Sequence, residues 1–167
     1  MLDDLVKEYL SLSDIMRKGY KDSLGTESQT WNETLSRLSP VVPDVFKAIY
    51  GEVSGTYRGI DNQTYMDFVP GYRLIHIEEL EKEYHTLLQM LASDDICEAR
   101  IRTIIPLLAD YSSCYVCYVE TYNNEEAVFH FSPDNGLQKM HASAELFFKT
   151  MIAFYLSGVF HLDEEGF

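Results

Sequence analysis

The stretch Tyr115-Val116-Cys117-Tyr118-Val119-Glu120-Thr121-Tyr122 decides the fold, because β-branched and aromatic side chains fill most of its positions. Such side chains favour the pleated, half-buried surface of a β-sheet. The turn pair Asn123-Asn124 follows, and the apolar run Ala127–Phe131 comes next. Two strand-like segments joined by a short polar turn indicate an antiparallel β-hairpin.

Further strand signals lie upstream of this hairpin. Side chains alternate in character from Arg100 to Ile105, and Pro106 is expected to end that strand. A short strand is expected at Tyr72–Ile75. Between Gly51 and Gly71 the pattern is one of strands and turns, with Tyr65, Asp67 and Val69 alternating with the more apolar Met66 and Phe68. A mostly antiparallel sheet follows from these short, closely spaced strands.

Helical patterns surround the strands. Apolar residues recur at helical spacing in five segments, and these segments are Leu2–Met16, Trp31–Leu38, Asp44–Tyr50, Leu80–Leu91 and the stretch from Ser143 to Gly158. Residues 19–30 are expected to form a loop. The acidic residues Glu78, Glu79, Glu81 and Glu83 begin the fourth helix and are expected to be solvated there, next to the positive end of the helix dipole. No repeat or linker divides the chain, so we predict one α+β domain whose mostly antiparallel or mixed sheet is flanked by helices.

The charge of the chain restricts the class of partner. Its 167 residues include 13 Lys and Arg against 27 Asp and Glu, a net charge of −14. Most of the excess falls from Asp61 onward, where 18 acidic residues face 6 basic ones. Phosphate would be repelled, so direct binding to nucleic acid is not expected. A protein with a basic surface fits better, although acidity can also serve solubility alone.

The number of cysteines and the length of the apolar segments indicate the cellular location. Three cysteines are too few for a secreted disulfide framework of this size. The first residues, Met1-Leu2-Asp3-Asp4, do not resemble a signal peptide, and no apolar run is long enough to span a bilayer. We therefore expect a cytoplasmic protein that does not contact a membrane.

One pattern resembles a catalytic motif. His76-Ile77-Glu78 with the later Cys114 and Cys117 matches the spacing of zinc deaminases. Ser113 stands where that signature has proline, and residues three apart on a strand point to opposite faces, so the two thiols would not converge. The other histidines lack metal-ligand spacing, and the paired carboxylates lie in turn-like, solvated segments. We expect a protein that is not an enzyme and needs no metal or cofactor, with a deaminase as the least favoured alternative.

Tyrosines next to acidic residues are the remaining candidates for function. The chain has 12 Tyr and 9 Phe, and tyrosine is favoured at protein interfaces because it combines a large contact area with a polar tip. The alternative is that most of these tyrosines are half-buried strand residues. The predicted partner-binding residues are Asp61, Tyr65, Asp67, Asp110, Tyr111, Glu120 and Tyr122.

The order of several short motifs resembles the SUKH superfamily, also called the Smi/Knr cell-wall-regulator family. The similar segments are Phe46–Tyr50 with Ser54-Gly55, Gly71–Leu74 before Ile77–Leu80, Ile105–Asp110, and Ser143–Phe148. The resemblance runs from Trp31 to the C-terminus, which gives a SUKH-like domain at residues 31–167 and a helical extension at residues 1–30. Tyr111–Ser113 and Glu120 depart from the family, which has a Gly- and Asp-containing turn and a strand ending in Asp at these places.

The resemblance implies an α+β fold and a function without catalysis. Many bacterial members of that family are immunity proteins that bind and block a cognate toxin, often a nuclease, and fungal members are scaffolds in cell-wall regulation. The leading hypothesis is therefore an immunity protein that neutralises a toxin through an acidic, Tyr-rich surface. A regulatory scaffold of the Smi/Knr type is the alternative.

Overall fold

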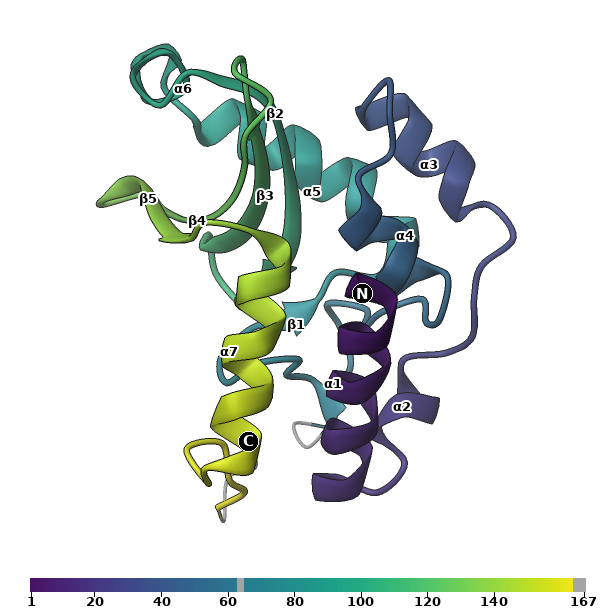
Figure 1. The fold of residues 1–167 in the computed structure, drawn as a ribbon. Coiled ribbons are helices and arrows are strands. Elements are labelled where there is room, and N and C mark those ends of the chain that lie inside the picture. Colours follow the sequence, from purple (N-terminus) through teal and green to yellow (C-terminus); the bar gives the residue numbers. More distant parts are fainter. Residues whose placement is uncertain (63–64, 164–167) are drawn as a thin grey trace.

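The structure, a computed structural model, describes residues 1–62 and 65–163 (Figure 1). It is an α+β domain with a five-stranded antiparallel sheet whose strands are neighbours in chain order. The strands are β1 (Arg73–Leu74), β2 (Ile101–Ala109), β3 (Tyr115–Thr121), β4 (Glu126–Ser132) and β5 (Gly136–His141). The helices are α1 (Leu2–Met16), α2 (Tyr20–Ser23), α3 (Trp31–Leu38), α4 (Asp44–Tyr50), α5 (Ile77–Met90), α6 (Ser93–Glu98) and α7 (Ala144–Leu156).

The predicted hairpin is confirmed as β3 and β4, with Val119 opposite Ala127. Asn124 takes the left-handed conformation in the turn, with φ 62°, which asparagine adopts more readily than most residues. The prediction that Pro106 ends its strand is wrong, since β2 continues to Ala109. The register shifts between Pro106 and Leu108, and a bulge accommodates a residue that has no N–H to donate.

The strand-like alternation at residues 65–69 does not form a strand. Asp67 instead organises a turn, since its carboxylate accepts the N–H of Gly71 at 3.0 Å and the N–H of Phe68 bonds to the carbonyl oxygen of Tyr72 at 2.7 Å. Strand β5 was not predicted, because its sequence Gly-Leu-Gln-Lys-Met-His has little β character and its place in the sheet depends on its pairing with β4. The short helices α2 and α6 were also missed.

Helices cover both faces of the sheet. Glu83 of α5 bonds to Tyr115 on one face, whereas Val116 lies with Phe147 of α7 on the other, because successive strand residues point to opposite faces. Helix α1 runs beside α7 (Figure 1). The ring of its Tyr9 is fully buried and lies 5.3 Å from the ring of Tyr155. The segment 1–30 thus contributes to the same core as the rest.

Across the described ranges, none of the helices combines the length and the apolar character needed to cross a membrane.

Candidate functional site

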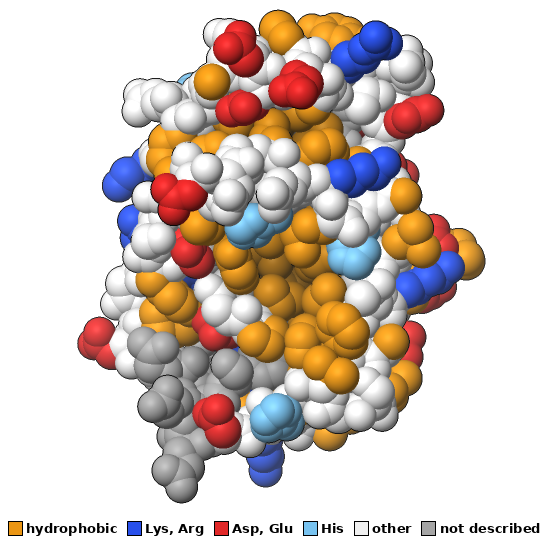
Figure 2. Space-filling model, turned by 90° about the vertical axis from the view of Figure 1, so that its left-hand side faces the viewer, with side chains coloured by type: hydrophobic (Ala, Val, Ile, Leu, Met, Phe, Trp, Pro, Cys, Tyr) orange, Lys and Arg blue, Asp and Glu red, His pale blue; other side chains and the backbone are white. Residues whose placement is uncertain are grey.

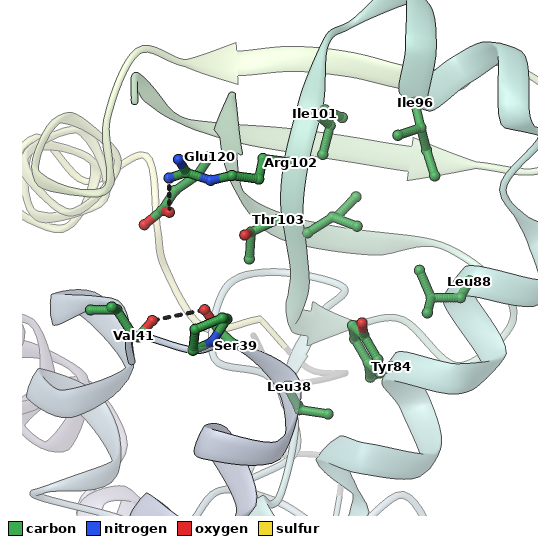
Figure 3. Close-up of a pocket in the computed structure, with 12 residues that line it drawn as sticks. Leu38, Ser39, Val41, Tyr84, Leu88, Ile96, Ile101, Arg102, Thr103 and Glu120 are labelled. Carbon is green, nitrogen blue, oxygen red and sulfur yellow. Dashed lines mark hydrogen bonds and ion pairs between the residues drawn. The ribbon is translucent and has the colours of Figure 1, made fainter. Parts of the chain in front are cut away.

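A cleft of about 550 Å³ opens between the α3–α4 connection, helices α5 and α6, and strands β2 and β3 (Figure 3). Most of its lining is apolar, and two lining residues are charged, Arg102 and Glu120. The apolar side chains come from separate parts of the chain, namely Leu38, Pro40, Val41, Tyr84, Leu88, Ile96, Ile101 and Ile104. A concave, mostly apolar site with a few polar groups is the usual form of a binding site.

The α3–α4 connection forms one wall because α3 has to stop before Pro40. Ser39 is extended, with φ −150° and ψ 138°, as a residue before proline prefers. Its hydroxyl donates to the carbonyl oxygen of Val41 at 2.8 Å. This wall leaves the Val41 side chain 74% exposed, so an apolar group stands in solvent at the rim of the cleft.

A fixed carboxylate lies at the strand side of the cleft. Arg102 donates to Glu120 at 2.9 Å and to the Asn124 side chain at 2.6 Å. The Tyr118 hydroxyl donates to the second oxygen of Glu120 at 2.7 Å. Burial and this hydrogen bond raise the pKa of Tyr118, so the phenol keeps its proton and remains a donor. The carboxylate of Glu120 is therefore held in place before any partner arrives.

A second, smaller hollow of about 230 Å³ lies between α7, β4, β5 and the turn around Pro70. It appears as the apolar depression at the centre of Figure 2. Phe147, Met151 and Phe154 supply much of its lining. The hydroxyl of Tyr72 and the Nε2 atom of His130, both from lining residues, bond to one another at 2.6 Å.

The expectation that the carboxylates at the start of α5 are solvated is confirmed for the exposed Glu78 and is wrong for Glu83, which belongs to a buried ionic cluster. Glu83 is only 6% exposed and pairs with the fully buried Arg73 at 3.1 Å. Tyr115 donates to the other oxygen of Glu83 at 2.5 Å, and Glu79 lies 3.5 Å from the Arg73 guanidinium. The sequence does indicate that Glu83 is buried, because its spacing from the core residues Leu80 and Leu87 places all three on one face of α5. A buried carboxylate requires such a cation.

The seven predicted partner-binding residues fall into two groups, near opposite ends of β3. Asp110 lies by the start of that strand, where its carboxylate accepts the N–H of Cys114 at 2.9 Å. Glu120 lies six positions after Cys114, which at about 3.3 Å per residue is roughly 20 Å. The seven residues therefore do not form one surface. The first group is Asp61, Tyr65, Asp67, Asp110 and Tyr111, and the second is Glu120 and Tyr122.

Within the first group, several side chains are engaged in the protein's own structure. The Tyr111 hydroxyl donates to Asp67, and the Tyr65 hydroxyl donates to the carbonyl oxygen of Lys18 at 2.7 Å. Asp67 is buried, whereas Asp61 is exposed. In the second group, Glu120 lines the cleft and Tyr122 is 70% exposed. The cleft thus includes one of the predicted residues, and its apolar walls were not predicted.

The residues of the deaminase-like pattern do not assemble into a metal site. Within residues 1–62 and 65–163, no three side chains of His, Cys, Asp or Glu are placed to hold one ion. His76 instead begins α5, where its Nδ1 atom accepts the N–H of Glu78 at 3.1 Å. Cys117 is fully buried.

Comparison with models of known protein families gives no match, and comparison with curated protein sequences gives none either. The resemblance to the SUKH superfamily therefore stays a prediction.

Proposed function

We propose that this chain is a non-enzymatic protein-binding module of the immunity type, which blocks a basic partner protein by covering its active surface. The observation that carries the proposal is the cleft itself, an apolar trough with the immobilised carboxylate of Glu120 at its side. Apolar walls give contact area, and a fixed charge gives orientation.

The charge around the cleft indicates the kind of partner. Helix α6 contributes Ile96 to the lining and carries Asp94, Asp95 and Glu98 beside it. The net charge of −14 adds a long-range attraction for a cationic surface. A nuclease toxin presents Lys and Arg to phosphate, so an acidic protein can occupy that surface and also speed the encounter.

Two exposed valines allow a matched test of this site. Val41 stands at the rim of the cleft, 74% exposed, whereas Val159 follows α7, is 56% exposed and does not line the cleft. We would co-purify the partner from the native cell, identify it, and titrate it with the Val41→Lys and Val159→Lys variants. Because both side chains are exposed, both variants should fold.

The expected result is that Val41→Lys weakens binding by about tenfold or more, because it places a positive charge on an apolar wall that the basic partner would cover. Val159→Lys should bind as the unmodified chain does. Equal affinities for both variants would show that the partner does not use the cleft. If no protein co-purifies in a stoichiometric complex, the proposed function is wrong.

A further inference from the structure

The turn between β4 and β5 carries a pair of residues that the proposed function does not use. Asn135 is followed by Gly136, and this is the only Asn-Gly pair in the sequence. Asn135 is exposed, and Gly136 has φ 65°. An asparagine is chemically labile where the next backbone nitrogen can reach the carbon of its side-chain amide. Glycine permits that approach best, because it has no Cβ beside its nitrogen and the widest backbone freedom.

The two hairpin turns of the sheet hold their asparagines differently. In the β3–β4 turn the side-chain oxygen of Asn124 accepts a hydrogen bond from Arg102 at 2.6 Å, and the next residue is Glu125. Across residues 1–62 and 65–163, no hydrogen bond engages the side chain of Asn135. Gly136 forms the pair of the β4–β5 ladder that is next to the turn, so opening of that single pair exposes its N–H.

The β4–β5 turn also touches a helix that borders the cleft. A Cβ at Gly136 would lie 3.3 Å from a carboxylate oxygen of Asp95 in α6, so this carboxylate packs against the glycine. The other oxygen of Asp95 accepts the N–H of Ala92 at 3.4 Å, where α6 begins. The next residue along α6, Ile96, lines the cleft. A change of charge or of backbone length at this turn therefore acts on a wall of the cleft.

We propose that Asn135 is a site of spontaneous deamidation, and that its conversion loosens α6. The backbone nitrogen of Gly136 gives up its proton to base and attacks the Cγ atom of Asn135. The new C–N bond closes a succinimide ring, while the bond from Cγ to Nδ2 breaks and the amide nitrogen leaves with a proton as ammonia. Water then adds to either ring carbonyl carbon, and the ring C–N bond at that carbon breaks. One water is consumed, one ammonia is released, and the product is aspartate or isoaspartate.

Both products change the surroundings of Asp95. Each adds a negative charge next to Asp134 and close to Asp95, and like charges at such short range repel. Isoaspartate also lengthens the backbone before Gly136 by one methylene, which shifts the glycine relative to Asp95. The start of α6 is then held less firmly. The inference rests on the proposed function only for the final consequence, a weaker grip on the partner protein.

Storage of the purified chain tests the chemistry. The chain would be kept for several weeks at mildly alkaline and at mildly acidic pH, and its peptides would be analysed by mass spectrometry. The mass change for replacement of ammonia by water should appear at Asn135 at least about tenfold faster than at Asn124. It should also appear faster at alkaline pH, because base removes the proton from the attacking nitrogen. Equal rates at the two asparagines, or an unchanged Asn135, would overturn the inference.

A matched variant tests the effect on α6. Asn135→Ser keeps a small polar side chain in the exposed turn and cannot form the ring. Hydrogen exchange would be compared between the stored unmodified chain and the stored variant. In the converted fraction the α6 amides should exchange about fivefold faster or more, whereas the amide of the fully buried Cys117 in β3 should be unchanged. Equal exchange of α6 in the two stored samples, or faster exchange of Cys117 as well, would refute the loosening of α6.

These outcomes separate the inference from the proposed function. Neither measurement needs a partner, so a stable Asn135 refutes the inference and leaves the proposed function standing. If no native partner co-purifies but Asn135 converts and α6 loosens, the inference stands and the proposed function is wrong. Where a partner is identified, it should bind the stored unmodified chain more weakly than the stored Asn135→Ser variant. Equal affinities would refute the link between this turn and the cleft.

Discussion

The buried pair between Arg73 and Glu83 should cost far more to break than an exposed pair of the same length on the same helix. Glu81 lies two residues before Glu83 on α5 and pairs with Arg37 at 3.1 Å, the distance also found between Arg73 and Glu83. The side chains of the first pair are 55% and 41% exposed, and those of the second are 0% and 8% exposed. Burial and the hydrogen bond from Tyr115 to Glu83 are therefore the main differences between the two pairs.

Glu83→Gln and Glu81→Gln provide the matched perturbation. Removing one member of a buried ion pair costs about 3–5 kcal/mol, because the other charge stays buried without compensation. Glu79 remains 3.5 Å from Arg73, so we expect the lower end, about 3 kcal/mol, for Glu83→Gln. An exposed pair contributes about 0–1 kcal/mol, and Glu81→Gln should fall in that range.

Urea denaturation of both variants measures these changes in the free energy of unfolding. At about 2–4 °C per kcal/mol for a domain of this size, Glu83→Gln should also lower the Tm by roughly 6–12 °C. The variant that replaces both Arg73 and Glu83 by apolar residues of similar volume should recover most of the loss. Equal costs for Glu83→Gln and Glu81→Gln would refute the reasoning from burial.

Three further predictions concern single residues. Gly55 has φ 103°, and a Cβ there would lie 2.6 Å from a backbone carbonyl oxygen. Gly55→Ala should therefore lower the free energy of unfolding, measured by urea denaturation, by about 2–5 kcal/mol. Gly71 has φ 86° in open space, so Gly71→Ala should lower it by only about 1–2 kcal/mol. Burial lowers the pKa of His76 below its ordinary value of 6.5, although two neighbouring glutamates oppose the shift. The imidazole therefore binds a proton more readily in the unfolded chain than in the folded one. The free energy of unfolding should fall as the pH drops below 6.5. His76→Asn should flatten that part of the stability profile between pH 7 and pH 5, and an unchanged slope would contradict the assignment. Burial raises the pKa of the Cys117 thiol, so this thiol should not react with iodoacetamide in the native protein. Mass spectrometry of the peptides should find the exposed Cys97 modified in the native protein, and Cys117 modified only in denaturant.

The sequence predicted those elements whose cause is local. Helix α1 has the predicted bounds Leu2–Met16 because its apolar spacing is regular, and α7 begins after Ser143, whose hydroxyl accepts the N–H of Leu146 at 3.0 Å. The hairpin of β3 and β4 follows from side-chain composition and a polar turn. These signals lie within a few residues of the structure they specify.

The features that the sequence did not predict depend on contacts between distant residues. Glu83 is buried because Arg73 meets it from β1, and Pro106 is tolerated within β2 because the register shifts at that point. The turn at Asp67 replaces the expected strand for the same kind of reason, since Arg17 of the N-terminal segment donates to the Asp67 carbonyl oxygen at 2.6 Å.

The candidate site was predicted least well. Glu120 was selected for its charge beside a tyrosine, but the cleft needs Val41, Tyr84 and Ile96 from three other segments. No periodicity within one segment reports that these side chains meet. Only the fold brings them together.

The pairing of α1 with α7 has a consequence for how the chain is made. These helices lie at the two ends of the sequence, with more than a hundred residues between them. At the usual rate of synthesis, α1 leaves the ribosome on the order of ten seconds before α7 exists. During that time α2 and α4 can already pack on α1, but the ring of Tyr9, which meets Phe148 and Tyr155 of α7 in the finished protein, lacks those contacts. Translation therefore leaves one apolar side of α1 uncovered until the last helix is made.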